Sequence, residues 1–148
     1  MKKLVKSEKR DLPESKIMIE KIKKVLEKHK EIVFSYLFGS FAKGLERKGS
    51  DVDIGIFLRK DYKKSAFYES EIALEIERKT GIRNVEVIVL NDKPLRFINQ
   101  VLRYGKLIFS RDEKERIKFE TLMTKKYIDF KPYYEEYDKL REKRLGIW

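Results

Sequence analysis

Two aspartates separated by one residue, Asp51 and Asp53, are the side chains of this sequence best placed to do chemistry. They open an otherwise apolar run that ends near residue 58, which predicts a β-strand. Alternate residues of a strand point to the same face, so the two carboxylates should project together with Cα atoms about 6.5 Å apart. Hard divalent cations take oxygen ligands, and two carboxylates on one rigid edge suit them. The pair therefore predicts a metal site.

A glycine and a serine, Gly39 and Ser40, precede this strand by a spacer of ten residues. Glycine lets the backbone approach a ligand closely, and the N-terminus of a following helix favours anions. The hydroxyls of Ser40 and Ser50 can contact phosphate oxygens. The spacer contains three basic residues, Lys43, Arg47 and Lys48, any of which can contact a triphosphate. We take Lys43 as the candidate phosphate contact. A phosphate cradle beside metal-binding carboxylates predicts a nucleotide site. The alternative is a surface turn before an edge strand with two solvated aspartates.

The stretch over residues 37–58, LFGSFAKGLERKGSDVDIGIFL, resembles the signature of the DNA polymerase β-like nucleotidyltransferase superfamily: Gly-Ser, a spacer, then Asp-x-Asp. The ten-residue spacer and the short chain are similar to the minimal nucleotidyltransferases of that superfamily. Among these, the chain resembles the antitoxins that are paired with HEPN-domain toxins. That similarity continues through residues 85–112 and into a tyrosine-rich tail.

The resemblance implies a magnesium-dependent nucleotidyltransferase that uses ATP to transfer AMP to a tyrosine of a cognate HEPN-type ribonuclease toxin. The chain would thereby act as an antitoxin, and the toxin could draw it into an oligomer. Two alternatives stay open. The enzyme could transfer a nucleotidyl group to an RNA end or a small molecule, or the chain could be a non-catalytic module that masks the toxin by contact.

The resemblance also implies a third carboxylate on a neighbouring strand, and Glu86 is the candidate metal ligand and catalytic base. It lies in the apolar run VEVIVL and should point opposite to Val85 and Val87. Family members more often carry aspartate there, so the longer glutamate departs from the pattern. The alternatives are a solvated residue on an edge strand, or Asp92 as the third acid, although the turn around Asp92 favours a structural role.

Hydrophobic periodicity predicts an α/β fold, with a small mixed β-sheet flanked by helices and a C-terminal helical tail. Strands are expected over residues 32–38, 51–58, 85–90 and 106–110, and helices over 13–30, 65–79 and about 94–103. The buried side of the helix over 65–79, which Gly81 should stop, is expected to contain Ala66, Phe67, Ile72, Ala73 and Ile76. The expected segments are a basic lead over 1–12, the nucleotidyltransferase domain over 13–112 and a helical extension over 113–148.

The extension should begin at the helix cap Asp112 and be interrupted near Pro132. Helical spacing relates Phe130, Tyr133, Tyr137 and Leu140, and Tyr127 and Tyr134 lie close by. We expect about half of this set to pack against the domain. The others could form a partner surface, because tyrosine suits interfaces.

Composition limits the function classes. The chain has a net charge of +11, but its basic residues are spread over the sequence and interleaved with acids, so nucleic acid is a possible rather than a favoured partner. The absence of cysteine excludes disulfides and thiolate metal sites. The single histidine, His29, is expected to end a helix rather than to bind a ligand. No apolar run spans a membrane and no secretory signal is present, so a cytoplasmic protein is expected.

Overall fold

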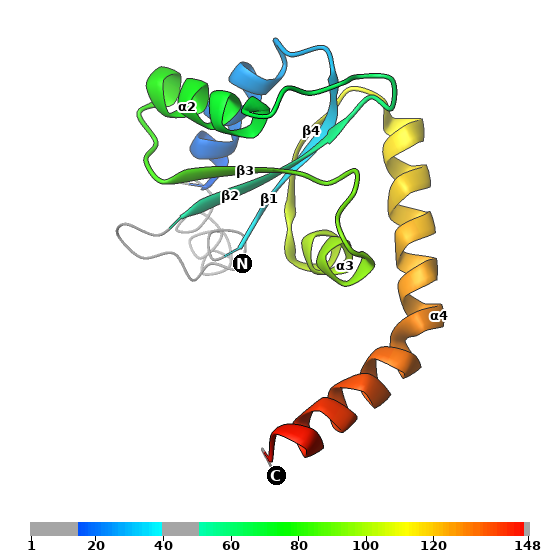
Figure 1. Cartoon of the computed structure of the whole chain (residues 1–148). Coiled ribbons are helices and arrows are strands. Elements are labelled where there is room, and N and C mark those ends of the chain that lie inside the picture. Colours follow the sequence, from blue (N-terminus) through cyan, green and yellow to red (C-terminus); the bar gives the residue numbers. More distant parts are fainter. Residues whose placement is uncertain (1–14, 40–50, 147–148) are drawn as a thin grey trace, which may run out of the picture.

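The computed structural model describes residues 15–39 and 51–146 of the chain. Its centre is a four-stranded sheet with the strand order β3-β2-β1-β4 (Figure 1). The strands are β1 (Ile32–Phe38), β2 (Val52–Leu58), β3 (Val85–Val89) and β4 (Lys106–Ser110). Strand β1 is antiparallel to β2 and β4, whereas β2 and β3 are parallel. All four strands lie within one residue of the apolar runs that predict them, and the mixed sheet confirms the expected architecture.

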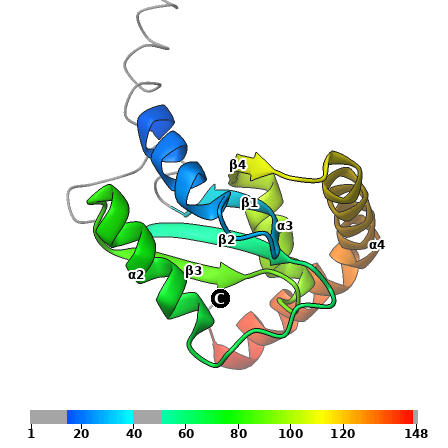
Figure 2. The ribbon, with the colours of Figure 1, turned by 90° about the horizontal axis from the view of Figure 1, so that it is seen from above.

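Helices cover both faces of the sheet (Figure 2). The first helix, over residues 15–26, and α2 (Tyr68–Thr80) pack on one face, where a core of buried side chains includes Leu26, Ile54 and Ile76. On the other face, α3 (Leu95–Tyr104) and the start of α4 (Glu113–Leu145) pack over a smaller core that contains Phe34 and Phe57. The two cores hold β1 and β2 in the middle of the sheet.

The first helix ends at residue 26, four residues before the predicted boundary, and a turn follows. The guanidinium group of Arg111, which follows β4, donates to the carbonyl oxygens of Glu27 and Ile32 at 2.8 and 3.1 Å. The carbonyl of Glu27 follows the last helical residue and that of Ile32 begins β1, so Arg111 joins the end of the helix to the start of the strand.

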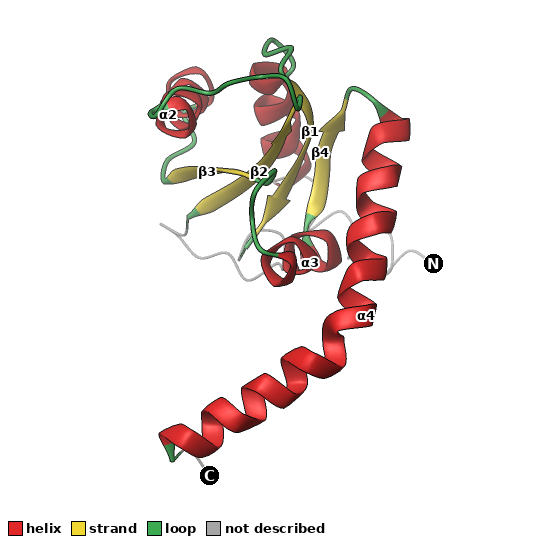
Figure 3. Ribbon diagram, turned by 45° about the vertical axis from the view of Figure 1, so that its right-hand side comes forward, coloured by secondary structure: helices red, strands yellow, loops and turns green. Residues whose placement is uncertain are grey.

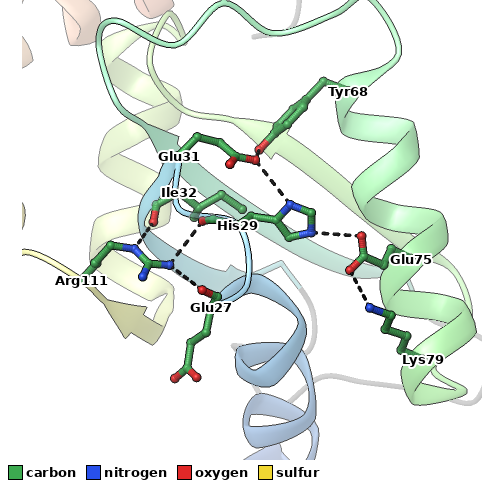
Figure 4. A network of polar contacts seen from close by, with 8 residues as sticks. All are labelled: Glu27, His29, Glu31, Ile32, Tyr68, Glu75, Lys79 and Arg111. Carbon is green, nitrogen blue, oxygen red and sulfur yellow. Dashed lines mark hydrogen bonds and ion pairs between the residues drawn. The ribbon is translucent and has the colours of Figure 1, made fainter.

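His29 lies just beyond the first helix, in a network that joins the helix end to α2 (Figure 4). Its Nε2 atom lies 3.0 Å from Oε1 of Glu75, and its Nδ1 atom lies 3.4 Å from Oε2 of Glu31. Tyr68 donates to the same Glu31 oxygen at 2.8 Å, and Lys79 donates to Glu75 at 3.2 Å. His29 therefore links two elements at a helix end, as the sequence predicts.

The start of α2 differs from the prediction. The helix begins at Tyr68 rather than at residue 65, and Ala66 and Phe67 precede it in exposed positions. Phe67 is 72% exposed, so its assignment to the buried side is wrong, and Tyr68 is buried instead. Tyrosine can fill this position because its ring enters the core while its hydroxyl reaches a carboxylate. Gly81 ends α2 with a positive φ of 79°, as expected.

Helix α4 runs over 33 residues without the expected interruption, with Pro132 inside it. Its first turn is capped as predicted, because the carboxylate of Asp112 accepts a hydrogen bond from the N–H of Glu115 at 3.1 Å. The helix bends in the part coloured orange in Figure 1 and then runs away from the sheet (Figure 3). Proline removes one hydrogen bond of a helix, which accounts for a bend at this place.

Two polar links attach α4 to the domain. The hydroxyl of Tyr36 donates to Glu120 at 2.6 Å. Further along, the guanidinium of Arg96 on α3 donates to both carboxylate oxygens of Asp138, at 2.9 and 3.1 Å, and also lies over the ring of Tyr134.

The aromatic residues of the tail divide into two groups. Tyr127 and Tyr134 are partly buried. The stripe that the helical spacing predicts is at least 49% exposed at every position: Phe130, Tyr133, Tyr137 and Leu140. The described part of α4 therefore presents an apolar stripe to solvent. In the described ranges, no helix combines the length and apolar character needed to cross a membrane.

Candidate active site

Three carboxylates meet where the parallel strands β2 and β3 begin. Asp53 and Glu86 are paired in the register of the two strands, whose backbones lie about 4.8 Å apart. Asp51 directly precedes β2 and is exposed, while Asp53 is partly exposed. Val52 and Ile54 point the other way and are buried in the core, as predicted. The alternation of the strand thus leaves the carboxylates on the side away from that core.

The electrostatics of this cluster are unfavourable for three bare carboxylates. Partial burial raises the pKa of Asp53 above its ordinary value, and the negative charges of Glu86 and Asp51 raise it further. A hydrogen bond with Glu86 acts in the same direction. A bound cation would remove this repulsion, and carboxylate oxygens are the donors that magnesium takes. The donor set therefore fits a magnesium ion.

The three side chains do not form a closed metal cage. Within residues 15–39 and 51–146, no group of three or more His, Cys, Asp or Glu side chains is arranged to hold a metal ion. Asp51, Asp53 and Glu86 thus remain predicted ligands, brought to one edge by the strands. Magnesium commonly binds through one or two carboxylates together with substrate phosphates, so an open arrangement suits a metal that arrives with a nucleotide.

Gly39 is fixed against the central carboxylate. It follows β1 with a φ of +77°, a conformation that favours glycine, and its neighbour Phe38 is paired with Asp53. A Cβ atom at Gly39 would collide with Oδ2 of Asp53. The backbone therefore lies directly against a proposed metal ligand, and the predicted close approach of Gly39 to a phosphate stays a prediction.

The remaining predicted site residues lie elsewhere. Ser40, Lys43, Ser50 and the alternatives Arg47 and Lys48 fall outside the described residues. Asp92 follows the far end of β3, so its interpretation as a substitute third acid is wrong. It lies in the turn after β3 that its sequence context predicts.

Two supporting residues were not predicted. Asn84 has a positive φ of 59°, and its carbonyl accepts a hydrogen bond from the N–H of Val52 at 2.8 Å. It therefore fixes the chain between Asp51 and Asp53. Asparagine tolerates this conformation better than most residues, which is the only signal in the sequence.

Phe97 on α3 supports the end of β1, because its ring packs edge-on against that of Phe38 with 5.7 Å between the ring centroids. The sequence does not predict this contact, since Phe97 looks like any other apolar residue of a helix.

Comparisons with known proteins agree with the fold. The family model "Polymerase beta, Nucleotidyltransferase" matches residues 20–114. Curated protein sequences give no match.

Several solved structures share the fold. A toxin–antitoxin structure with AMP-PNP aligns at a TM-score of 0.60 and 22% identity, over 87% of this chain and 94% of the other. A structure of a tri-AMPylated HEPN toxin with an MNT antitoxin, from Shewanella oneidensis, aligns at 0.65 and 18% identity, over 84% and 95%. The toxin–antitoxin MntA–HepT aligns at 0.64 and 18% identity, over 84% and 96%. At these identities the likeness concerns the fold.

Proposed function

Because the chain belongs to the polymerase beta nucleotidyltransferase family, we propose that it transfers AMP from ATP to a tyrosine of a HEPN-type toxin and acts as the antitoxin. The register that pairs Asp53 with Glu86 beside Asp51 carries this proposal. It sets three carboxylates at one edge, next to the glycine turn at Gly39. Magnesium is the metal we assign to the site.

One bond between phosphorus and oxygen forms and another breaks, while one proton is transferred. The tyrosine oxygen attacks the α-phosphorus of ATP, the bond from that phosphorus to the β-phosphate breaks, and pyrophosphate leaves. Asp51 and Asp53 would hold the metal, whose charge would offset that of the phosphates. Glu86 accepts the proton of the tyrosine hydroxyl, and Gly39 keeps Asp53 in position. Ser40, Ser50 and Lys43 are the proposed phosphate contacts.

The proposal also specifies ATP as the nucleotide and a toxin tyrosine as the acceptor. They are supported by the solved structures of the same fold, one of which contains AMP-PNP and another a tri-AMPylated HEPN toxin. The raised pKa of Asp53 adds a physical reason for metal dependence, since the carboxylate cluster needs a counter-charge.

A second candidate is masking of the toxin by contact. It is favoured by the exposed stripe of α4, where Tyr133 is 68% and Tyr137 is 59% exposed. Exposed aromatic side chains on a helix suit a protein interface. Under this alternative, substitutions at Tyr133, Tyr134 or Tyr137 would reduce inhibition more than substitutions at Asp51 or Asp53.

One experiment distinguishes the two. The protein would be incubated with labelled ATP, magnesium and the HEPN-type protein encoded beside it, and single-turnover transfer of label would be measured. Glu86→Gln should bind ATP but lose most of the transfer rate, because a neutral amide cannot accept the proton. Glu86→Asp is the matched variant and should stay active. A parent protein that silences the toxin without transferring label would overturn the enzymatic proposal in favour of masking.

A further inference from the structure

A cleft of about 670 Å³ lies at the carboxyl ends of β2 and β3, at the opposite end of these strands from the carboxylates. Its walls come from the loop after β2, the turn after β3 and the first turns of α4, which lie together in Figure 1. Leu58 lies five positions after Asp53 on β2, so about 16 Å separates the two ends. Ligands of open α/β sheets bind in crevices at the carboxyl ends of parallel strands.

The floor of the cleft is apolar and held in place. Phe57 stacks on Phe34 at 4.7 Å, and Phe119 of α4 packs against Phe57 at 4.9 Å. The side chain of Asn91 accepts from the N–H of Leu58 at 2.9 Å and donates to its carbonyl at 2.8 Å. These contacts fix the strand end, the turn and the helix relative to one another. Preformed clefts of this size with an apolar lining are typical of small-molecule sites.

The rim of the cleft carries more basic than acidic side chains. Arg59 and Lys64 line it but are paired with Asp61 and Glu69. Three further lysines line it and have no ion-pair partner in the described part of the chain: Lys60, Lys114 and Lys118.

Three acids line the cleft as well. Asp112 is engaged in capping α4, which leaves Asp92 and Glu115 beside the lysines. Three lysines without an ion-pair partner among the described residues therefore face two acids, which leaves the rim with a small excess of positive charge. An anion would complement this rim.

We infer that this cleft is a second nucleotide site, which binds a free nucleoside polyphosphate independently of the carboxylate edge. The base lies on the apolar floor near Phe119 and Tyr62, and the phosphates lie against Lys60, Lys114 and Lys118. Aromatic side chains are good platforms for bases, and lysines are good partners for phosphates. Because this rim needs no metal, binding here should persist when divalent cations are removed.

Equilibrium dialysis with labelled ATP tests the inference on the full chain. In excess EDTA the parent should bind one ATP per chain at this cleft. The double variant Lys114→Glu/Lys118→Glu should weaken that binding about tenfold or more, because it replaces two cations that face the phosphates with anions. The matched control is Lys139→Glu/Lys143→Glu, with the same charge change and spacing in the exposed far part of α4, which should bind like the parent.

Two further measurements sharpen the result. Asp51→Asn/Asp53→Asn should retain EDTA-resistant binding, while any second, magnesium-dependent ATP per chain should be lost. Inorganic tripolyphosphate should bind more weakly than ATP, since it cannot use the floor. Thermal melts of all variants would confirm that they are folded.

Three outcomes would overturn the inference: no ATP bound in EDTA, equal loss in the control pair, or tripolyphosphate binding as tight as that of ATP. A ten-nucleotide RNA that binds the cleft far more tightly than ATP would replace it with an RNA site. Failure of magnesium-dependent binding alone would contradict the proposed enzyme and leave this cleft unaffected.

Discussion

The two ends of the parallel strands β2 and β3 are stabilised in opposite ways. At the amino-terminal ends, Asp53, Glu86 and Asp51 repel one another, and the pKa of Asp53 is raised. At the carboxyl ends, Asn91 makes two hydrogen bonds to Leu58, and aromatic rings pack beneath the cleft. Among the described residues, no ion pair offsets the negative charge at the first end, whereas the second end is held by packing and hydrogen bonds and has lysines on its rim.

This difference has a consequence for function. Carboxylates that repel in the free protein gain stabilisation when a cation binds, so metal binding at that end is driven partly by relief of repulsion. The opposite end is held by packing and hydrogen bonds, and the positive charge on its rim suits an anion rather than a cation. We therefore expect chemistry that needs charge neutralisation at the amino-terminal ends, and binding without a metal at the other.

The largest expected effect comes from removing a carboxylate at the reactive end. Asp53→Asn should lower the rate of AMP transfer by about 10²–10³-fold, because an absent metal ligand forfeits several kcal/mol of transition-state stabilisation. Single-turnover assays in magnesium would measure this. ATP binding in EDTA should stay unchanged, since the cleft is at the other end. Near-parental turnover would remove Asp53 from the metal site.

The next largest loss of transfer is expected from a substitution at Gly39, with Gly81 as the matched position. Gly39→Ala and Gly81→Ala both place a side chain at a positive φ, of 77° and 79°, at a cost of about 1–2 kcal/mol each. Only at Gly39 does the new Cβ collide with Asp53, since Gly81 has no atom within 4 Å of that position. Gly39→Ala should therefore also lower transfer about tenfold or more, because small displacements of reacting groups are costly.

Gly81→Ala is the control and should keep its transfer rate. Thermal melts and transfer assays on both variants would separate backbone strain from displacement of Asp53. Equal activity of the two would show that Gly39 has no part in positioning the carboxylate.

The sequence predicts the strands well because each is an apolar run with a clear boundary. Residues 32–38 and 106–110 match β1 and β4 to the residue. The start of α2 is missed because helical spacing alone favours Phe67 over Tyr68 as the buried residue. The phenol ring of Tyr68 can be buried because Glu31, which is distant in sequence, accepts a hydrogen bond from its hydroxyl.

The carboxylates of the site are predictable, but their pairing is not. Asp51 and Asp53 follow from a short pattern, whereas the register of Asp53 with Glu86 depends on β3 lying beside β2. The cleft escapes prediction because its parts are far apart in the sequence. Asn91 reads as an ordinary turn residue, and its bonds to Leu58 cross 33 positions.

A substitution at the ordered end should affect stability rather than chemistry. Asn91→Ala removes both hydrogen bonds to the backbone of Leu58 and leaves those groups without their partner, which should cost about 1–3 kcal/mol. ATP binding in EDTA should weaken because the cleft loses its support, while transfer at a permissive temperature should stay near parental. Denaturant unfolding and dialysis would measure the two effects. A large loss of transfer would show that the two ends are coupled.

The smallest effect concerns the stability of the metal-free protein. The folded pKa of Asp53 lies above its unfolded value, so the folded state binds more protons and stability falls as the pH rises through that interval. Asp53→Asn removes the charge that causes this loss of stability. In EDTA at about pH 7 the variant should therefore melt above the parent, by at most about 2–4 °C, because the side chain is partly exposed and solvent screens the repulsion. Near pH 3, below the ordinary carboxyl pKa of about 3.9, the difference in melting temperature should vanish.

Asp129→Asn on the exposed face of α4 is the control and should shift stability by less than about 0.5 kcal/mol. Melting curves at both pH values would measure this, and a variant less stable than its parent at pH 7 would mean that the carboxylate end is not strained by its own charge.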